Sequence, residues 1–200
     1  KGPPQGSVAS TRLANVYIHY AFELWVNQWR KKFATGDVIV VRYADDFVMG
    51  FQHRHEAERF LKDLQERMKK FGLALHPEKT RLIEFGRFAA QNRERQGERK
   101  PETFDFLGFT HICGKRFWSK GFIVRRQTVT KRLRTKLKDV KETLMRNRHE
   151  PLAKLGDWLG KVVRGYLNYH AIPGNIEQVA VFRSEATKIW YRALKRRSQR

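Results

Sequence analysis

Segment 38–50 constrains this chain most, because it places two adjacent carboxylates, Asp45 and Asp46, between two short apolar runs. Residues 38–41 and 47–49 are β-branched or apolar and too short for helices, so they predict two buried strands. Aspartate is common in turns. The pattern therefore predicts a β-hairpin with both acids at its tip.

Two unpaired carboxylates at one tip repel each other, so a divalent cation is their natural partner. Oxygen ligands of this kind suit Mg²⁺ better than zinc or copper, which indicates phosphate chemistry. Taken alone, the Asp-Asp pair also fits plain turn chemistry. The residues in front of it, Tyr43 and Ala44, favour the functional interpretation.

Tyr43-Ala44-Asp45-Asp46 between hydrophobic strands resembles the catalytic palm hairpin of reverse transcriptases. The chain as a whole is similar to the bacterial group II intron reverse transcriptase/maturase family, because several motifs follow in that family's order. These are Gly2-Pro-Pro-Gln-Gly6, Leu13-Ala-Asn15, the hairpin, Gly72-Leu-Ala-Leu-His-Pro-Glu-Lys-Thr80, Phe106-Leu-Gly-Phe109 and Arg164-Gly-Tyr-Leu-Asn-Tyr169.

The resemblance implies an α+β fold. Residues 1–125 would form the C-terminal part of a polymerase palm, an antiparallel sheet with helices on one face. Residues 126–200 would form an α-helical thumb bundle, or maturase-specific domain. The fingers and the first catalytic strand, which carries another metal-binding Asp, are expected before Lys1.

The implied activity is template-directed DNA synthesis on RNA, with two Mg²⁺ ions in the complete enzyme. Asp45 would be the main metal ligand and Asp46 would support the site. Lys79 would lie near the pyrophosphate of the incoming nucleotide, and Leu107 and Gly108 would belong to the primer grip. The full set of primer, template and nucleotide contacts would be Gln5, Gly6, Tyr43, Ala44, Lys79, Leu107 and Gly108.

Charge points to a polyanionic partner. The chain carries a formal net charge of +22, of which residues 1–100 hold +7 and residues 101–200 hold +15. Such an excess destabilises a compact state unless counter-charge is supplied, so nucleic acid is the economical explanation. Six basic residues surround the apolar stripe of a predicted helix and are the candidate RNA-binding set: Lys131, Arg132, Arg134, Lys136, Lys138 and Lys141.

The expected partners are an RNA template, intron RNA, a DNA primer or target, and deoxynucleoside triphosphates. No apolar run of 18 residues or lipid motif suggests a membrane. Cys113 is the single cysteine, which excludes an internal disulfide and a Cys-rich zinc site. The cytoplasm of a bacterium is the expected location.

Two alternatives stay open. The palm could serve as a non-catalytic RNA-binding splicing scaffold, although a scaffold has no need to hold two acids together. The chain could also be a related bacterial reverse transcriptase acting outside an intron. Residues 164–169 and Pro173-Gly174-Asn175 favour the intron family over this second alternative.

Periodicity predicts the remaining elements. A first helix would have one apolar face, formed by Leu13, Val16/Tyr17, Tyr20/Ala21, Leu24/Trp25 and Trp29, and a second helix, over residues 55–71, would end at a left-handed Gly72. Strands are predicted at 73–75 and 80–85, a mobile loop at 86–102, and short strands over 104–124 with turns at 114–115 and 120–121. Three helices follow, over 129–144, 152–169 and 176–194, with five aromatics expected in their core: Trp158, Tyr166, Tyr169, Trp190 and Tyr191.

Overall fold

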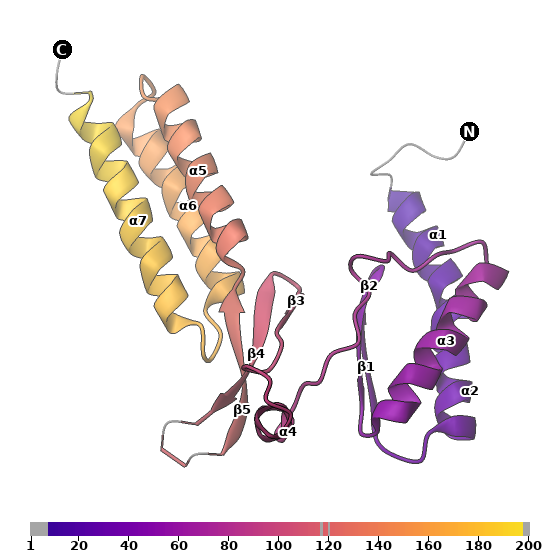
Figure 1. Ribbon diagram of the computed structural model, residues 1–200. Helices are drawn as coiled ribbons and strands as arrows, with labels where there is room; N and C mark the ends of the chain where they lie inside the picture. Colours follow the sequence, from indigo (N-terminus) through magenta and orange to yellow (C-terminus); the bar gives the residue numbers. More distant parts are fainter. Residues whose placement is uncertain (1–7, 117, 120, 198–200) are drawn as a thin grey trace. The chain divides into compact units, whose positions relative to one another are not determined.

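The computed structural model describes residues 8–116, 118–119 and 121–197. The fold is α+β, as predicted, and the chain forms two compact units, Lys1–Ile83 and Glu84–Arg200. We call them the N-terminal unit and the C-terminal unit and describe each by itself (Figure 1).

The N-terminal unit consists of helices around one β-hairpin. Its helices are α1 (Val8–Ile18), a π-helical turn η1 (His19–Glu23), α2 (Leu24–Phe33) and α3 (Arg54–Lys70). Strands β1 (Val38–Tyr43) and β2 (Asp46–Phe51) pair antiparallel, with Val38 opposite Phe51 and Tyr43 opposite Asp46. This pairing confirms the predicted hairpin. Figure 1 shows α2 and α3 on the same side of it.

An aromatic-rich core joins the hairpin to the helices. Phe22, Val26 and Trp29 pack against Phe60 and Leu64 of α3. The inner face of the hairpin covers this cluster with Val40, Phe47, Met49 and Phe51. Alternation along the strands thus directs one set of side chains into the core and leaves the other set, which includes Tyr43 and Asp46, exposed.

The buried face of the first helix differs from the prediction. Leu13 and Tyr20 of the predicted face are exposed and only Ala21 beside them is buried, whereas Phe22 and Val26, which were not on the predicted face, are buried. The segment is apolar on two sides, so periodicity alone could not choose between them, and the π-helical turn changes the register between α1 and α2. Trp29 is buried as predicted.

The segment after α3 contains no strand within the described residues, so the strands predicted at 73–75 and 80–85 are wrong. Gly72 has a φ of +64°, as predicted, and the amide of Leu73 caps the helix by donating to the carbonyl of Met68 at 2.9 Å. His76–Thr80 form a turn in which the carbonyl of His76 accepts from the amides of Lys79 and Thr80. These local bonds use the amides that a strand would need for pairing.

The C-terminal unit begins with α4 (Ala89–Arg95), where a mobile loop was predicted. Arg93 ties this helix to the following segment through ion pairs with Glu98 and Glu102. A three-stranded antiparallel sheet follows, with β3 (Phe104–Phe106), β4 (Phe109–Lys115) and β5 (Phe122–Thr128) in that order. The turn between β3 and β4 is Leu107–Gly108. The predicted turn at 114–115 is wrong, because Gly114 and Lys115 lie within β4.

Three helices complete this unit, close to their predicted ranges: α5 (Thr130–Arg146), α6 (Leu152–His170) and α7 (Ile176–Lys195). They form a bundle (Figure 1). One core layer contains Val140, Leu144, Leu155 and Leu159, and a second layer contains Leu133, Tyr166 and Phe182. Among the residues described, we find no helix with the length and apolar character needed to cross a membrane.

The predicted division into palm and thumb at residue 125 remains a prediction. In the structure, β5 runs through this position to Thr128, and α5 begins two residues later.

Candidate functional site

The two aspartates lie where the sequence predicts them. We call residues 43–46 the aspartate turn: Tyr43 ends β1, Ala44 and Asp45 form the turn, and Asp46 begins β2. Asp45, Asp46 and Tyr43 are all exposed. The hairpin therefore presents two carboxylates and a phenol ring to solvent at one tip.

The backbone of this turn is strained at one residue. Ala44 has a φ of +54°, a left-handed conformation that residues other than Gly, Asn and Asp seldom adopt. Such a conformation costs roughly 1–3 kcal/mol and persists only where the surrounding structure imposes it. Strain of this kind next to two aspartates is typical of a functional turn.

The donor set fits a hard divalent cation in part. Two exposed carboxylates on adjacent residues offer oxygen ligands of the kind that Mg²⁺ prefers. Over the described residues, however, no group of three or more His, Cys, Asp or Glu side chains is arranged to hold a metal ion. Asp45 and Asp46 are therefore fitted to contribute to a metal site that needs further ligands.

Of the other contacts predicted for the N-terminal region, only Lys79 lies within the described residues. Lys79 is exposed in the turn after His76. Gln5 and Gly6 lie outside the described residues. Their proposed roles in binding template and nucleotide stay predictions.

In the C-terminal unit, the predicted primer-grip residues form a tight turn docked on the helices. Leu107 and Gly108 have φ values of +49° and +81°. The hydroxyl of Tyr169 donates to the carbonyl of Leu107 at 2.8 Å, and the amide of Val129 donates to the carbonyl of Gly108 at 3.1 Å. A Cβ atom on Gly108 would lie 3.0 Å from the guanidinium of Arg132, so a side chain there would push Arg132 away.

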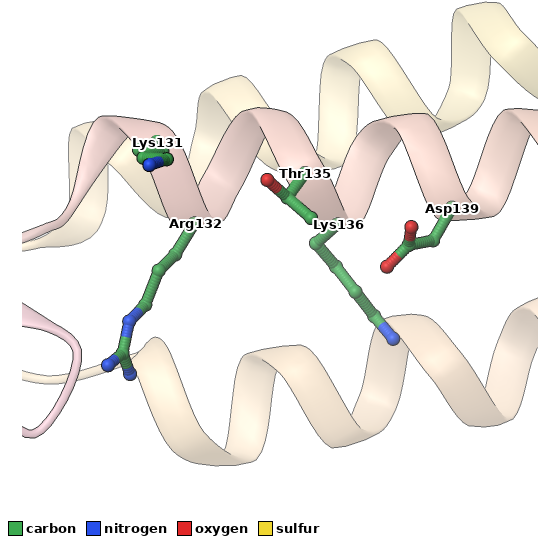
Figure 2. A pocket seen from close by; sticks show the side chains of 5 residues that line it. All are labelled: Lys131, Arg132, Thr135, Lys136 and Asp139. Atoms are coloured by element: carbon green, nitrogen blue, oxygen red, sulfur yellow. The ribbon is translucent and has the colours of Figure 1, made fainter.

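Arg132 also borders a groove between α5 and α6. The groove has a volume of about 460 Å³. We call it the basic groove; its lining residues are Arg132, Lys136, Lys161, Val162, Gly165, Tyr166, Tyr169 and His170. Figure 2 shows Arg132 and Lys136 extending from α5 in the same direction, away from Lys131 and Thr135. Three cations over an apolar and aromatic floor suit a phosphate backbone with its attached sugars.

The six predicted RNA-binding residues thus divide into two groups. All six are exposed, but only Arg132 and Lys136 line the basic groove. Lys131 shares a shallow pocket with them on α5, together with Thr135 and Asp139 (Figure 2). Arg134, Lys138 and Lys141 line neither of these two pockets. Lys138 forms an ion pair with Glu142, in which Nζ lies 3.7 Å from Oε1.

A buried polar junction holds the sheet on the bundle beside this groove. Asn175 is fully buried, accepts from the amide of Thr128 at 2.8 Å and donates to the Thr128 hydroxyl and the His170 carbonyl, both at 2.8 Å. Burial, and secondly the charge of Arg132, lowers the pKa of His170. A neutral imidazole beside Arg132 adds no repulsion to the groove.

Sequence reasoning missed several of these residues. Lys161 and Tyr169 lie on one face of α6, eight residues apart, and Tyr169 is 54% exposed although it was expected in the core. Tyr191 is likewise exposed, whereas Tyr166 is buried and Trp158 and Trp190 pack against the core as predicted. Arg42 was missed too, although a charged residue at an inward position of an alternating strand, after Val38 and Val40, signals a specific partner.

Comparisons with known proteins agree with this geometry. The sequence model of the family described as reverse transcriptase (RNA-dependent DNA polymerase) matches residues 1–111, a range that contains the aspartate turn. A comparison with curated proteins gives no match. Because the matched range covers more than half of the 200 residues, the chain belongs to the reverse transcriptase (RNA-dependent DNA polymerase) family.

Proposed function

We propose that this chain is part of the RNA-directed DNA polymerase of a bacterial group II intron, in which it also binds intron RNA for splicing. The observation that carries the proposal is the aspartate turn. In a chain of the reverse transcriptase family, two carboxylates are exposed together at the tip of a hairpin whose other face is buried on helices.

Asp45 and Asp46 would hold Mg²⁺ together with ligands from elsewhere in the enzyme. When bound, Mg²⁺ supplies positive charge that activates the primer hydroxyl and stabilises the leaving pyrophosphate. Asp45 is the main ligand in this proposal. Exposed Tyr43, opposite Asp46 on the neighbouring strand, would pack against the primer or the incoming nucleotide.

The basic groove would bind the nucleic-acid backbone. Arg132, Lys136 and Lys161 offer three cations to successive phosphates, and exposed Tyr169 offers a ring face for a sugar or base. Because Tyr169 also holds the Leu107–Gly108 turn, a strand bound in the groove would lie beside the proposed primer grip.

The intron context is supported by the motifs of the C-terminal region. Residues 164–169 and 173–175 suggested the intron family, and two of these residues make long-range hydrogen bonds in the structure. Tyr169 binds the Leu107 carbonyl, and Asn175 joins the sheet to the bundle. The proposal includes a location inside the bacterial cell, where intron RNA is available.

Primer extension by an active enzyme that contains this chain tests the proposal. Asp45→Ala and Asp45→Asn should lower DNA synthesis on an RNA template by roughly 1,000-fold or more, because nothing else replaces the charge stabilisation lost with the metal. Binding of RNA should persist, since the basic groove is untouched.

Asp37→Asn is the matched control. Asp37 is an exposed acid just before the opposite end of the same hairpin, so its replacement removes one carboxylate from the same hairpin but not from the aspartate turn. Near-normal synthesis by the Asp45 variants would disprove the assignment. Equal losses in Asp37→Asn and Asp45→Asn would also contradict it.

A further inference from the structure

Arg42 is a charged residue on the buried side of the hairpin, next to the aspartate turn. Alternation along β1 places it on the same face as Val38 and Val40, and its side chain is only 16% exposed. A guanidinium in that position needs partners that replace water.

Its partners connect the turn to the helix. Nε donates to Oε1 of Glu23 at 2.7 Å. Nη1 donates to the carbonyl oxygen of Ala44 at 2.5 Å and to Oδ1 of Asn15 at 3.3 Å. One planar group thus joins the strained residue of the aspartate turn to two residues of the helical segment.

The helical end of this connection is itself fixed. Glu23 ends the π-helical turn, and its Oε2 lies 2.6 Å from Nδ1 of His19. Hydrogen bonds from His19, and then from Arg42, lower the pKa of Glu23, so its carboxylate stays ionised as the partner of Arg42. Arg67 of α3 donates to the carbonyls of Ala21 and Tyr20 in the same π-helical turn.

We propose that Arg42 is a positioning residue for the aspartate turn. By holding the carbonyl of Ala44 against Glu23 and Asn15, it keeps Ala44 in its left-handed conformation and so fixes the direction in which Asp45 and Asp46 project. Its effect on catalysis rests on the proposed function, whereas its effect on the turn does not. Lysine cannot replace it fully, because one ammonium lacks the planar fork that reaches Glu23, Ala44 and Asn15 together.

The first test needs no enzymatic activity and uses residues 1–200. In Arg42→Gln, the amides of residues 44–46 should exchange with solvent several-fold faster than in the parent, while amides in the middle of β1 and α3 keep their rates. Arg54→Gln is the matched control, because it also removes an arginine paired with a glutamate, Glu58, at 2.8 Å. Unchanged exchange at the turn would overturn the proposal, and so would equally faster exchange throughout the N-terminal unit.

The second test is primer extension by the active enzyme. Arg42→Gln should lower kcat by about 10- to 100-fold, in the range seen when residues that orient metal ligands are removed, with KM for the deoxynucleotide little changed. Arg42→Lys should lie between this variant and the parent. Arg42 and Glu23 act as one ion pair. Adding Glu23→Gln to Arg42→Gln should therefore lower kcat little further.

Asp45→Asn, measured beside these variants, separates the two proposals. If Asp45→Asn keeps normal synthesis, the proposed function is wrong, while the exchange measurement still decides the role of Arg42. If Asp45→Asn is inactive and Arg42→Gln has the parental kcat, the positioning role is wrong and the proposed function stands.

Discussion

At the scale of single residues, several polar groups are held by partners that are far away in the sequence. Glu56 of α3 is 2% exposed and accepts from the amide and the hydroxyl of Thr35, both at 2.6 Å, and from the amide of Gly36 at 3.3 Å. It thereby fixes the bend that leads from α2 into β1. The hairpin depends on this carboxylate as well as on its apolar contacts.

Hydrogen bonding makes Glu56 a source of acid sensitivity. The bonds from Thr35, its hydroxyl first, lower the pKa of Glu56 below its ordinary value. A group whose pKa is lowered in the folded state stabilises the protein at neutral pH, and this contribution is lost as the pH falls through the folded-state pKa. Unfolding of the N-terminal unit should therefore become easier below about pH 4.

Glu56→Gln should flatten this pH dependence, because the amide oxygen still accepts a bond but does not titrate. This flattening would be measured as the protection of the Thr35 and Gly36 amides from exchange, relative to their intrinsic rates at each pH, from pH 6 downward to about pH 3. Glu58→Gln removes an exposed carboxylate of the same helix and should keep the parental profile. A parental profile in Glu56→Gln would show that Glu56 does not titrate with folding.

Single residues also explain what the sequence could reveal of the site. Asp45 and Asp46 were identifiable because adjacent acids between apolar runs form a local pattern. The pairing of Arg42 with Glu23 was not, because it depends on how a helix packs on a strand 19 residues later in the chain. Tyr169 was expected in the core because apolar residues share its helix. Its hydrogen bond to the Leu107 carbonyl depends on how the Leu107–Gly108 turn docks on that helix, which the local sequence does not reveal.

At the scale of elements, the long helices were predictable because each repeats its apolar pattern over many residues, and the hairpin was predictable because two short apolar runs flank a turn. Other short elements were not. The Leu107–Gly108 turn requires positive φ at a leucine, which no turn preference suggests, and α4 is a helix of seven polar and small residues held by Arg93. Such segments are too short to show a periodic apolar pattern, which is the signal on which the sequence predictions depend.

The basic groove between α5 and α6 gives a prediction at this scale. Replacing the three cations of the basic groove, Arg132, Lys136 and Lys161, with glutamine should weaken binding of structured RNA by residues 1–200. The slope of log affinity against log salt should become shallower by about 3, since each of the three lost phosphate contacts removes close to one unit.

A triple variant of equal charge is the control. Arg134→Gln, Lys138→Gln and Lys141→Gln also remove three positive charges from the bundle, but from positions that line neither pocket described above. The control should keep a steeper slope than the groove variant. Indistinguishable slopes would mean that net charge, and not the groove, governs binding.

At the scale of the whole molecule, the count of carboxylates limits what the chain does alone. Two Mg²⁺ ions need acidic ligands from more than one strand besides substrate phosphates, and no third metal-binding group accompanies Asp45 and Asp46 within the described ranges. We therefore predict that residues 1–200 bind RNA but do not extend a primer.

Supplying the missing ligands should restore synthesis. Primer extension with Mg²⁺ and deoxynucleotides on an RNA template, with and without a segment that carries a further catalytic aspartate strand and the nucleotide-binding fingers, measures this. Asp45→Asn in the reconstituted enzyme is the negative control. Robust extension by residues 1–200 alone would show that another acid of this chain completes the site.

Cys113 gives the molecule a built-in chemical reporter. Its thiol is half-buried in β4 and accepts a hydrogen bond from the amide of Gly86 at 3.3 Å, and burial raises its pKa. The thiolate is the nucleophile that attacks alkylating reagents, and burial disfavours the thiolate of Cys113, so alkylation at neutral pH should be slow while the thiol stays half-buried. As the chain has one cysteine, the rate of its labelling should report how readily the surroundings of the Cys113 thiol in β4 open to solvent, without any engineered probe.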